Sequence, residues 1–152
     1  MILEAFSKSS KTTLVLIGNW SNSAFGIQVK SKYQDFETIY LLDPIYDQDI
    51  LNEIRSNCEF YIHGHSAGGT NPSLVEAMSL GLPTLCYNIN YNVETTECSA
   101  LYFKSSVDLI NLIKSTGQDE LKQIGYKMKN IAQNRYTWSI ISNQYRKLFE
   151  KY

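Results

Sequence analysis

Hydrophobic and polar positions along this chain follow two alternating patterns, which together predict an α/β protein. Short continuous apolar runs are typical of strands buried on both faces, and they alternate with segments whose apolar residues recur at helical spacing. The expected strands are Thr13–Ile17, Glu37–Leu42, Phe60–Ile62, residues 83–87 and Ala100–Phe103. The expected helices are residues 1–8, 22–32, Asp47–Asn57 and 72–80. We therefore expect a Rossmann-like fold, a parallel sheet with helices on both faces.

After residue 105 the pattern becomes wholly helical. One apolar stripe consists of Leu121, Ile124, Met128 and Ile131, and a second consists of Trp138, Ile141, Tyr145 and Leu148. These stripes predict C-terminal helices. Because no linker, repeat or low-complexity segment interrupts the chain, we expect residues 1–152 to form a single domain.

The segment between the third and fourth expected strands carries the strongest candidate chemistry. A strand-like run opens into a loop with Gly64, Gly68 and Gly69, and Asn71-Pro72 then provides the start signals of a helix. Free backbone N–H groups and the positive end of the helix dipole attract anions there, and glycines let a phosphate come close. A plain tight connection is the alternative interpretation of these glycines.

Glu76 stands three residues after Ser73, so the two share one face of the expected helix. Its side chain tilts towards the helix start, where a carboxylate suits sugar hydroxyls better than phosphate. The neighbouring residues are apolar, so the carboxylate needs a partner, and ligand hydroxyls or its own loop are the candidates. A phosphate cradle beside a hydroxyl acceptor suggests a nucleotide or nucleotide sugar. An ordinary solvated glutamate is the alternative.

Two histidines, His63 and His65, alternate at the end of the third strand and would share a face. A metal site needs at least a third ligand, and none follows at suitable spacing, so we expect no metal. Either histidine can tie down the loop or donate to a diphosphate or sugar oxygen. His65 is the preferred donor because it lies nearer the glycines.

Other rim loops supply weaker candidates. Asp43 and Tyr46 lie between a strand and a helix, where they would border a base, although a plain proline turn explains them equally well. Thr95 and Thr96 follow the fourth strand and are candidate phosphate contacts.

The stretch Asn71–Thr84 resembles the donor-binding motif of retaining family-4 glycosyltransferases of GT-B fold. In that family, a carboxylate at the position of Glu76 contacts the ribose of the nucleotide. The glycine-rich stretch His63–Pro72 looks most like a bacterial subgroup of capsule and O-antigen rhamnosyltransferases, which favours a dTDP-rhamnose donor. The resemblance covers nearly the whole chain and matches it to the C-terminal, donor-binding half of a two-domain enzyme.

The resemblance assigns a role to each candidate residue and implies neither a metal nor a cofactor. The family has an additional glutamate eight positions before the ribose-binding one, where it contacts the donor sugar, and Gly68 stands at that position here. Sugar contacts would then come from backbone amides around Gly68–Asn71, or from His63, His65 or Asn71. The expected diphosphate and sugar contacts are His65, Gly68, Gly69, Thr70, Asn71 and Ser73, with Glu76 on the ribose and Asp43 and Tyr46 on the rim of the base site.

The resemblance also predicts that the chain is a fragment. Its first residues match a helix that follows the family's first strand and diphosphate-binding Arg/Lys loop. The missing N-terminal domain would bind a saccharide or lipid-linked saccharide acceptor, for transfer into surface polysaccharide. We expect the isolated chain to be inactive and prone to self-association through its exposed sheet edge and last helix.

Composition bears on the ligand class and the cellular location of the protein. A net charge of −1 and a pI of about 6.1 give no electrostatic footprint for nucleic acid. Three cysteines without metal spacing indicate reduced thiols in the cytoplasm, and the full-length protein could lie peripherally at the inner face of the plasma membrane. Two other interpretations compete with a glycosyltransferase domain. One is a non-catalytic flavodoxin-like or receiver-like regulatory module, and the other is a scaffold domain that uses its terminal helices for assembly.

Overall fold

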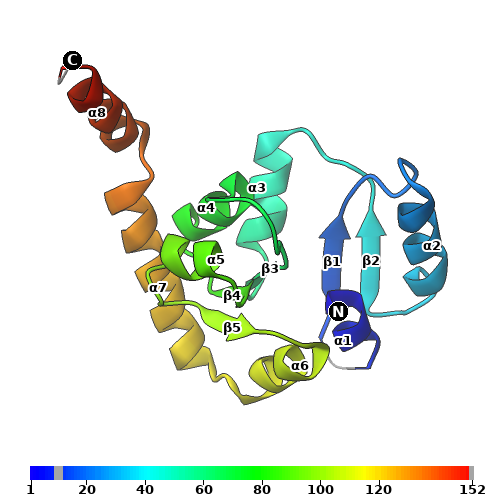
Figure 1. The fold of residues 1–152 in the computed structure, drawn as a ribbon. Helices are drawn as coiled ribbons and strands as arrows, with labels where there is room; N and C mark the ends of the chain where they lie inside the picture. The colour runs from blue at the N-terminus through cyan, green and yellow to red at the C-terminus, as the bar shows by residue number, and fades with distance from the viewer. Residues whose placement is uncertain (9–11, 151–152) are drawn as a thin grey trace. The chain divides into compact units, whose positions relative to one another are not determined.

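The computed structural model describes residues 1–8 and 12–150, and they form two compact units (Figure 1). The first unit comprises Met1–Glu53 and Lys104–Ser115, and the second comprises Ile54–Phe103 and Thr116–Tyr152. Helix α3 (Gln48–Ser56) crosses from one unit to the other along the sequence. The candidate phosphate loop and Glu76 belong to the second unit.

The first unit contains two parallel strands, β1 (Leu14–Ile17) and β2 (Ile39–Leu42), with Leu14 opposite Ile39. Its helices are α1 (Ile2–Ser7), α2 (Ala24–Tyr33) and α6 (Ser106–Ser115). Helix α1 packs against α6, and the core of this unit is formed by Ala5, Phe6, Leu14, Ile39 and Leu109.

The second unit is built on three parallel strands in the order β3 (Tyr61–His63), β4 (Thr84–Tyr87) and β5 (Leu101–Phe103). Its other helices are α4 (Pro72–Ser79), α5 (Asn90–Thr95), α7 (Gln118–Arg135) and α8 (Trp138–Phe149). The main apolar cluster joins α4, β4 and α7, and its members are Leu74, Met78, Cys86, Ile124, Met128, Ile131 and Ala132.

A close backbone contact joins the end of α4 to α7. Gly81 follows α4 with a φ of +76°, a left-handed conformation in which glycine is favoured. A Cβ atom at Gly125, in the middle of α7, would collide with the backbone oxygen of Gly81. Gly125 therefore allows α7 to approach the turn that follows α4, and Gly81 supplies the left-handed backbone of that turn.

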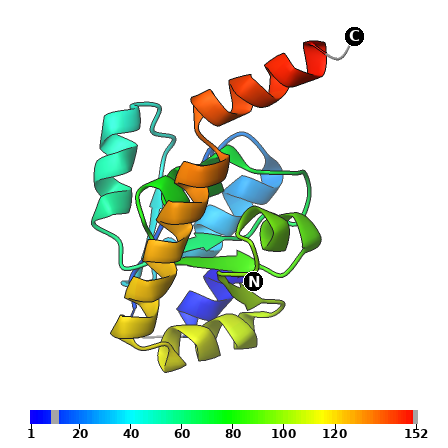
Figure 2. The same ribbon diagram turned by 90° about the vertical axis from the view of Figure 1, so that its left-hand side faces the viewer.

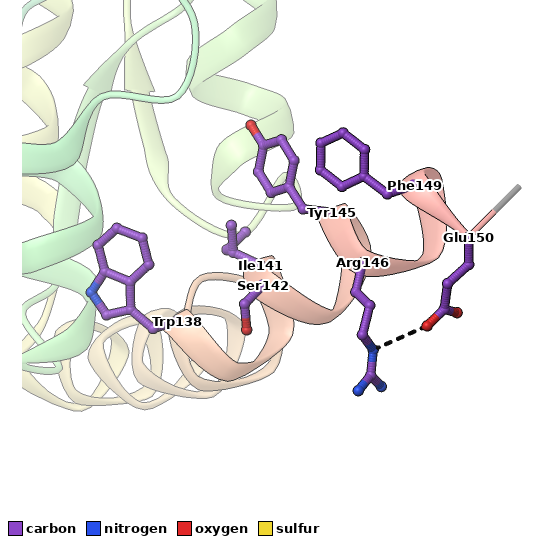
Figure 3. A pocket seen from close by; sticks show the side chains of 7 residues that line it. All are labelled: Trp138, Ile141, Ser142, Tyr145, Arg146, Phe149 and Glu150. Atoms are coloured by element: carbon purple, nitrogen blue, oxygen red, sulfur yellow. Dashed lines mark ion pairs between the residues drawn. The ribbon is translucent and has the colours of Figure 1, made fainter. Parts of the chain in front are cut away.

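Helix α8 projects beyond the end of α7 in both views of the fold (Figures 1 and 2). Trp138, Ile141, Tyr145 and Phe149 point to one side of it, and Arg146 and Glu150 form an ion pair on the other side (Figure 3). Trp138 is 87% exposed and Phe149 is 78% exposed. Figure 3 labels the residues that line a shallow hollow here. All of them lie on or directly after α8, so the hollow is formed by this one helix.

The expected α/β organisation with parallel strands and C-terminal helices is confirmed. The strands form two parallel sheets, one in each unit. Strand β3 extends to His63, one residue beyond the expected end, and the short helix α5 was missing from the expectations. Among residues 1–8 and 12–150, no helix has the length and apolar character needed to cross a bilayer.

We predict that Gly125→Ala lowers the free energy of unfolding by about 1–3 kcal/mol, because its methyl group forces α7 away from Gly81. Gly69→Ala is the matched control, since open space surrounds a Cβ at that exposed loop position, and its effect should stay within about 0.5 kcal/mol. Urea unfolding of both variants measures the difference. Equal stability of the two variants would contradict the described packing.

Candidate functional site

The loop of residues 64–71 joins the carboxyl end of β3 to the start of α4, and both of its ends are fixed. His63, the last residue of β3, is buried, whereas residues 64–70 are all exposed. At the other end, the Asn71 side chain caps α4 by accepting a hydrogen bond of 3.0 Å from the Ser73 N–H. Ligands of parallel α/β folds bind at the carboxyl ends of strands, so this exposed loop occupies the expected place for one.

Helix α5 holds the first part of the loop. Asn92 is 2% exposed, and its amide donates to the backbone oxygens of His65 at 3.0 Å and Tyr87 at 2.9 Å. The Tyr91 hydroxyl donates to the Ser66 backbone oxygen at 3.2 Å. Sequence reasoning missed Asn92 as a positioning residue, because no local motif distinguishes it and the contact joins residues 27 positions apart.

The two central glycines face open space. Gly68 has a φ of +108°, a conformation that residues with a side chain rarely adopt. A Cβ atom at Gly68 or Gly69 would meet nothing within 4 Å. Packing therefore does not require glycine at either position. The conformation explains Gly68, and Gly69 leaves room for a group that approaches the backbone.

The His63 imidazole is an unusual polar group in this site. It is 1% exposed, and neither Nδ1 nor Nε2 has a hydrogen-bond partner among the described residues. Burial lowers its pKa to about 4, and the neighbouring His65 acts in the same direction. The two rings stack with centroids 4.7 Å apart. A buried polar group without a partner costs roughly 1–3 kcal/mol, so it calls for an explanation.

Glu76 has a partner that sequence reasoning did not find. Its carboxylate pairs with the Arg55 guanidinium of α3 at 2.8 Å, and the Arg55 side chain is only 14% exposed. Arg55 is thus a partner in addition to the two expected candidates, ligand hydroxyls and the loop itself. No sequence spacing connects residues 55 and 76, because the pair forms only when α3 and α4 come together.

The weaker candidates divide into two groups. In the first unit, Asp43 pairs with Lys30 at 3.2 Å, and Tyr46 is 89% exposed. In the second unit, Thr95 and Thr96 are buried, and the Thr96 hydroxyl donates to the Asn92 backbone oxygen at 2.7 Å. Both threonine side chains belong to the packed interior around α5, and their contact with phosphate stays a prediction.

Among the residues that the structure describes, no three histidine, cysteine or acidic side chains are grouped closely enough to hold a metal ion. The site therefore consists of exposed backbone amides, a capped helix start, two stacked histidines and a paired carboxylate. Such an arrangement can hold an anion by its amides and hydroxyl groups by its side chains.

Comparison with solved structures identifies the fold. The structure of Anabaena HepE in complex with UDP-glucose superposes on this chain with a TM-score of 0.82 and 18% identity, covering 99% of this chain and 44% of that one. The chain has the fold of the C-terminal half of a GT-B glycosyltransferase.

Sequence comparison finds only distant relatives, and no family model matches. The glycosyltransferase 1 domain-containing protein 1 of Xenopus tropicalis is 23% identical over 97% of this chain, which corresponds to 44% of that protein. Protein CapJ of Staphylococcus aureus is 25% identical over 80% of this chain and 30% of its own length. The chain thus spans less than half the length of the proteins that it resembles.

The low pKa of His63 predicts acid sensitivity. Below about pH 6.5 the unfolded chain binds a proton at this residue, but the folded chain does not until about pH 4. Stability should therefore fall as the pH drops through this window, by about 3 kcal/mol in total from this group. Urea unfolding between pH 7.5 and 4.5 measures the loss.

The variant His63→Phe isolates this contribution, because phenylalanine keeps a stacking ring and cannot titrate. The wild-type chain should lose more stability on acidification than the variant does. If the free energy of unfolding falls equally with pH in the two proteins, His63 is not the residue responsible for the acid sensitivity.

Proposed function

We propose that this chain binds the donor substrate of a retaining glycosyltransferase, a nucleoside diphosphate sugar, at the 64–71 loop and the first turn of α4. The observation that carries this proposal is the exposed glycine loop, which ends directly at a capped helix start. The fold shared with GT-B glycosyltransferases supports the same assignment.

The diphosphate would be bound by backbone N–H groups between Gly68 and Ser73. The first N–H groups of a helix lack partners within the helix, and the helix dipole adds positive potential there. His65 and the Thr70 hydroxyl would contribute further donors at the edge of the loop. In glycosyl transfer the diphosphate is the leaving group, so fixed donors that stabilise its developing charge would speed the reaction electrostatically.

The ribose would be bound by Glu76, with Arg55 as its positioning residue. An ion pair at 2.8 Å holds the carboxylate in one position beside the proposed phosphate site. The carboxylate has two oxygens, so one can stay on Arg55 while the other accepts from a ribose hydroxyl.

The chemistry of the whole protein is a further part of the proposal. A second part, corresponding to the remaining length of the relatives, would bind a saccharide or lipid-linked saccharide acceptor and complete the active site. Similarity to CapJ supports a role in capsule biosynthesis. The resemblance of the loop to rhamnosyltransferases favours dTDP-rhamnose, whereas HepE was solved with UDP-glucose.

A thermal-shift screen tests the proposal. UDP-glucose, GDP-mannose and dTDP-rhamnose are compared for the rise in melting temperature that they give the wild-type chain, because a ligand that binds only the folded state stabilises it. We expect at least one to raise the melting temperature in a dose-dependent manner. The absence of a shift with all three, at millimolar concentration, would contradict the proposal.

We predict that Gly69→Val abolishes binding of the best nucleotide and leaves the far-UV circular dichroism unchanged. The open space at Gly69 admits the side chain without a collision, but the branched group then occupies the path of the phosphate. Calorimetric titration measures the affinity. An unchanged affinity would remove the loop from the site.

We predict that Glu76→Gln weakens nucleoside diphosphate binding roughly tenfold. Glutamine carries no charge, so the hydrogen bond that it accepts from a ribose hydroxyl is weaker by about 1–2 kcal/mol. Glu120→Gln is the matched control on α7, since it removes the same charge from an exposed position of the same unit. Titration of both variants gives the comparison.

The variant Arg55→Met distinguishes a binding role from a purely structural one. If Glu76→Gln and Arg55→Met lower stability alike and neither changes the affinity, the ion pair only fastens α3 to α4.

A further inference from the structure

His63 combines features that a packing residue does not need. Within the described residues, its Nδ1 and Nε2 are the two buried side-chain nitrogen or oxygen atoms that lack a hydrogen-bond partner. It ends β3 and immediately precedes Gly64, so it lies under the start of the exposed loop. An apolar ring would fill the same space without leaving polar atoms unpaired. The unpaired nitrogens therefore point to a function in a bound state.

The chemistry of the ring restricts what can bind it. Because burial holds the pKa near 4, the imidazole is neutral at physiological pH and offers one N–H donor and one nitrogen acceptor. Phosphate oxygens that carry no proton can only accept hydrogen bonds. A hydroxyl group both donates and accepts, so hydroxyl groups satisfy both nitrogens, and a sugar presents several of them close together.

We propose that His63 binds hydroxyl groups of the transferred sugar and so contributes to the choice of donor. This rests on the proposed function, because it assumes that a nucleoside diphosphate sugar occupies the loop. His63 directly precedes the loop whose backbone amides would hold the diphosphate, so the sugar attached to that diphosphate would lie near it. Helix α4 starts on the far side of the same loop, where the diphosphate would lie.

Access to His63 requires the His65 side chain to move. The His65 ring stacks on His63 with centroids 4.7 Å apart and lies in the exposed loop. Asn92 fixes the backbone oxygen of His65, so the loop can stay in place while the His65 side chain turns away. Rotation of an exposed side chain is fast, so this step would not limit binding.

The test compares each nucleotide with and without its sugar in wild type and His63→Phe. The pairs are UDP with UDP-glucose, GDP with GDP-mannose and dTDP with dTDP-rhamnose, each titrated by calorimetry. We expect His63→Phe to lose about tenfold in affinity for the sugar nucleotide that binds, and to keep its affinity for the matching diphosphate. His63→Gln retains a donor and an acceptor and should recover part of the loss.

Imidazole NMR provides a readout on the unaltered protein, which decides the matter even if the His63 variants fail to fold. The chain has two histidines, so ¹⁵N-histidine labelling gives two imidazole spin systems, and His65→Gln assigns them. We expect the His63 nitrogens to shift on addition of the sugar nucleotide and to stay unchanged with the diphosphate alone.

Three results would overturn the inference. Equal losses for diphosphate and sugar nucleotide would mean that His63 only supports the loop. Unchanged affinities and unchanged His63 signals would mean that a permanently bound water satisfies the ring. If wild type binds none of the six compounds, the proposed function itself fails and this inference fails with it.

Discussion

The anchoring of the 64–71 loop is the constraint on which the site depends. Eight residues with three glycines would sample many conformations if they were free, and ordering them on binding would cost affinity. Here the loop begins after a buried histidine, is held at residues 65 and 66 by Asn92 and Tyr91, and ends at the Asn71 cap. The loop is therefore anchored on both sides of Gly68 and Gly69 before a ligand arrives, while these glycines remain exposed.

The rest of the second unit positions this loop. Gly125 lets α7 approach the turn after α4 closely, and this contact helps to fix the direction of α4 and hence of its N-terminus. The ion pair between Arg55 and Glu76 joins α4 to the end of α3 on another side. Buried polar contacts around α5, including Thr96 with Asn92 and Tyr102, hold the helix that supports the loop. His63 fits this arrangement as a group whose unpaired nitrogens cost stability, as functional sites commonly do.

Local signals predicted most of the fold. The apolar runs gave every strand to within a residue or two, and the Asn71-Pro72 start and Gly81 stop defined α4. Residues whose roles depend on long-range contacts could not be predicted. Arg55, Asn92 and the buried state of Thr95 and Thr96 all depend on which elements pack together, and no spacing in the sequence records that. Helix α5 was missed because six residues hold too little periodicity to distinguish a helix from a loop.

Amide NMR mapping on the wild-type chain tests the central claim most directly. A ¹⁵N-labelled sample is titrated with UDP, GDP and dTDP, and the residues whose amide signals move are assigned. The account predicts that the largest changes fall on residues 64–73, with smaller ones at Glu76 and Arg55. Changes confined to the exposed face of α8, or distributed without relation to the loop, would contradict it.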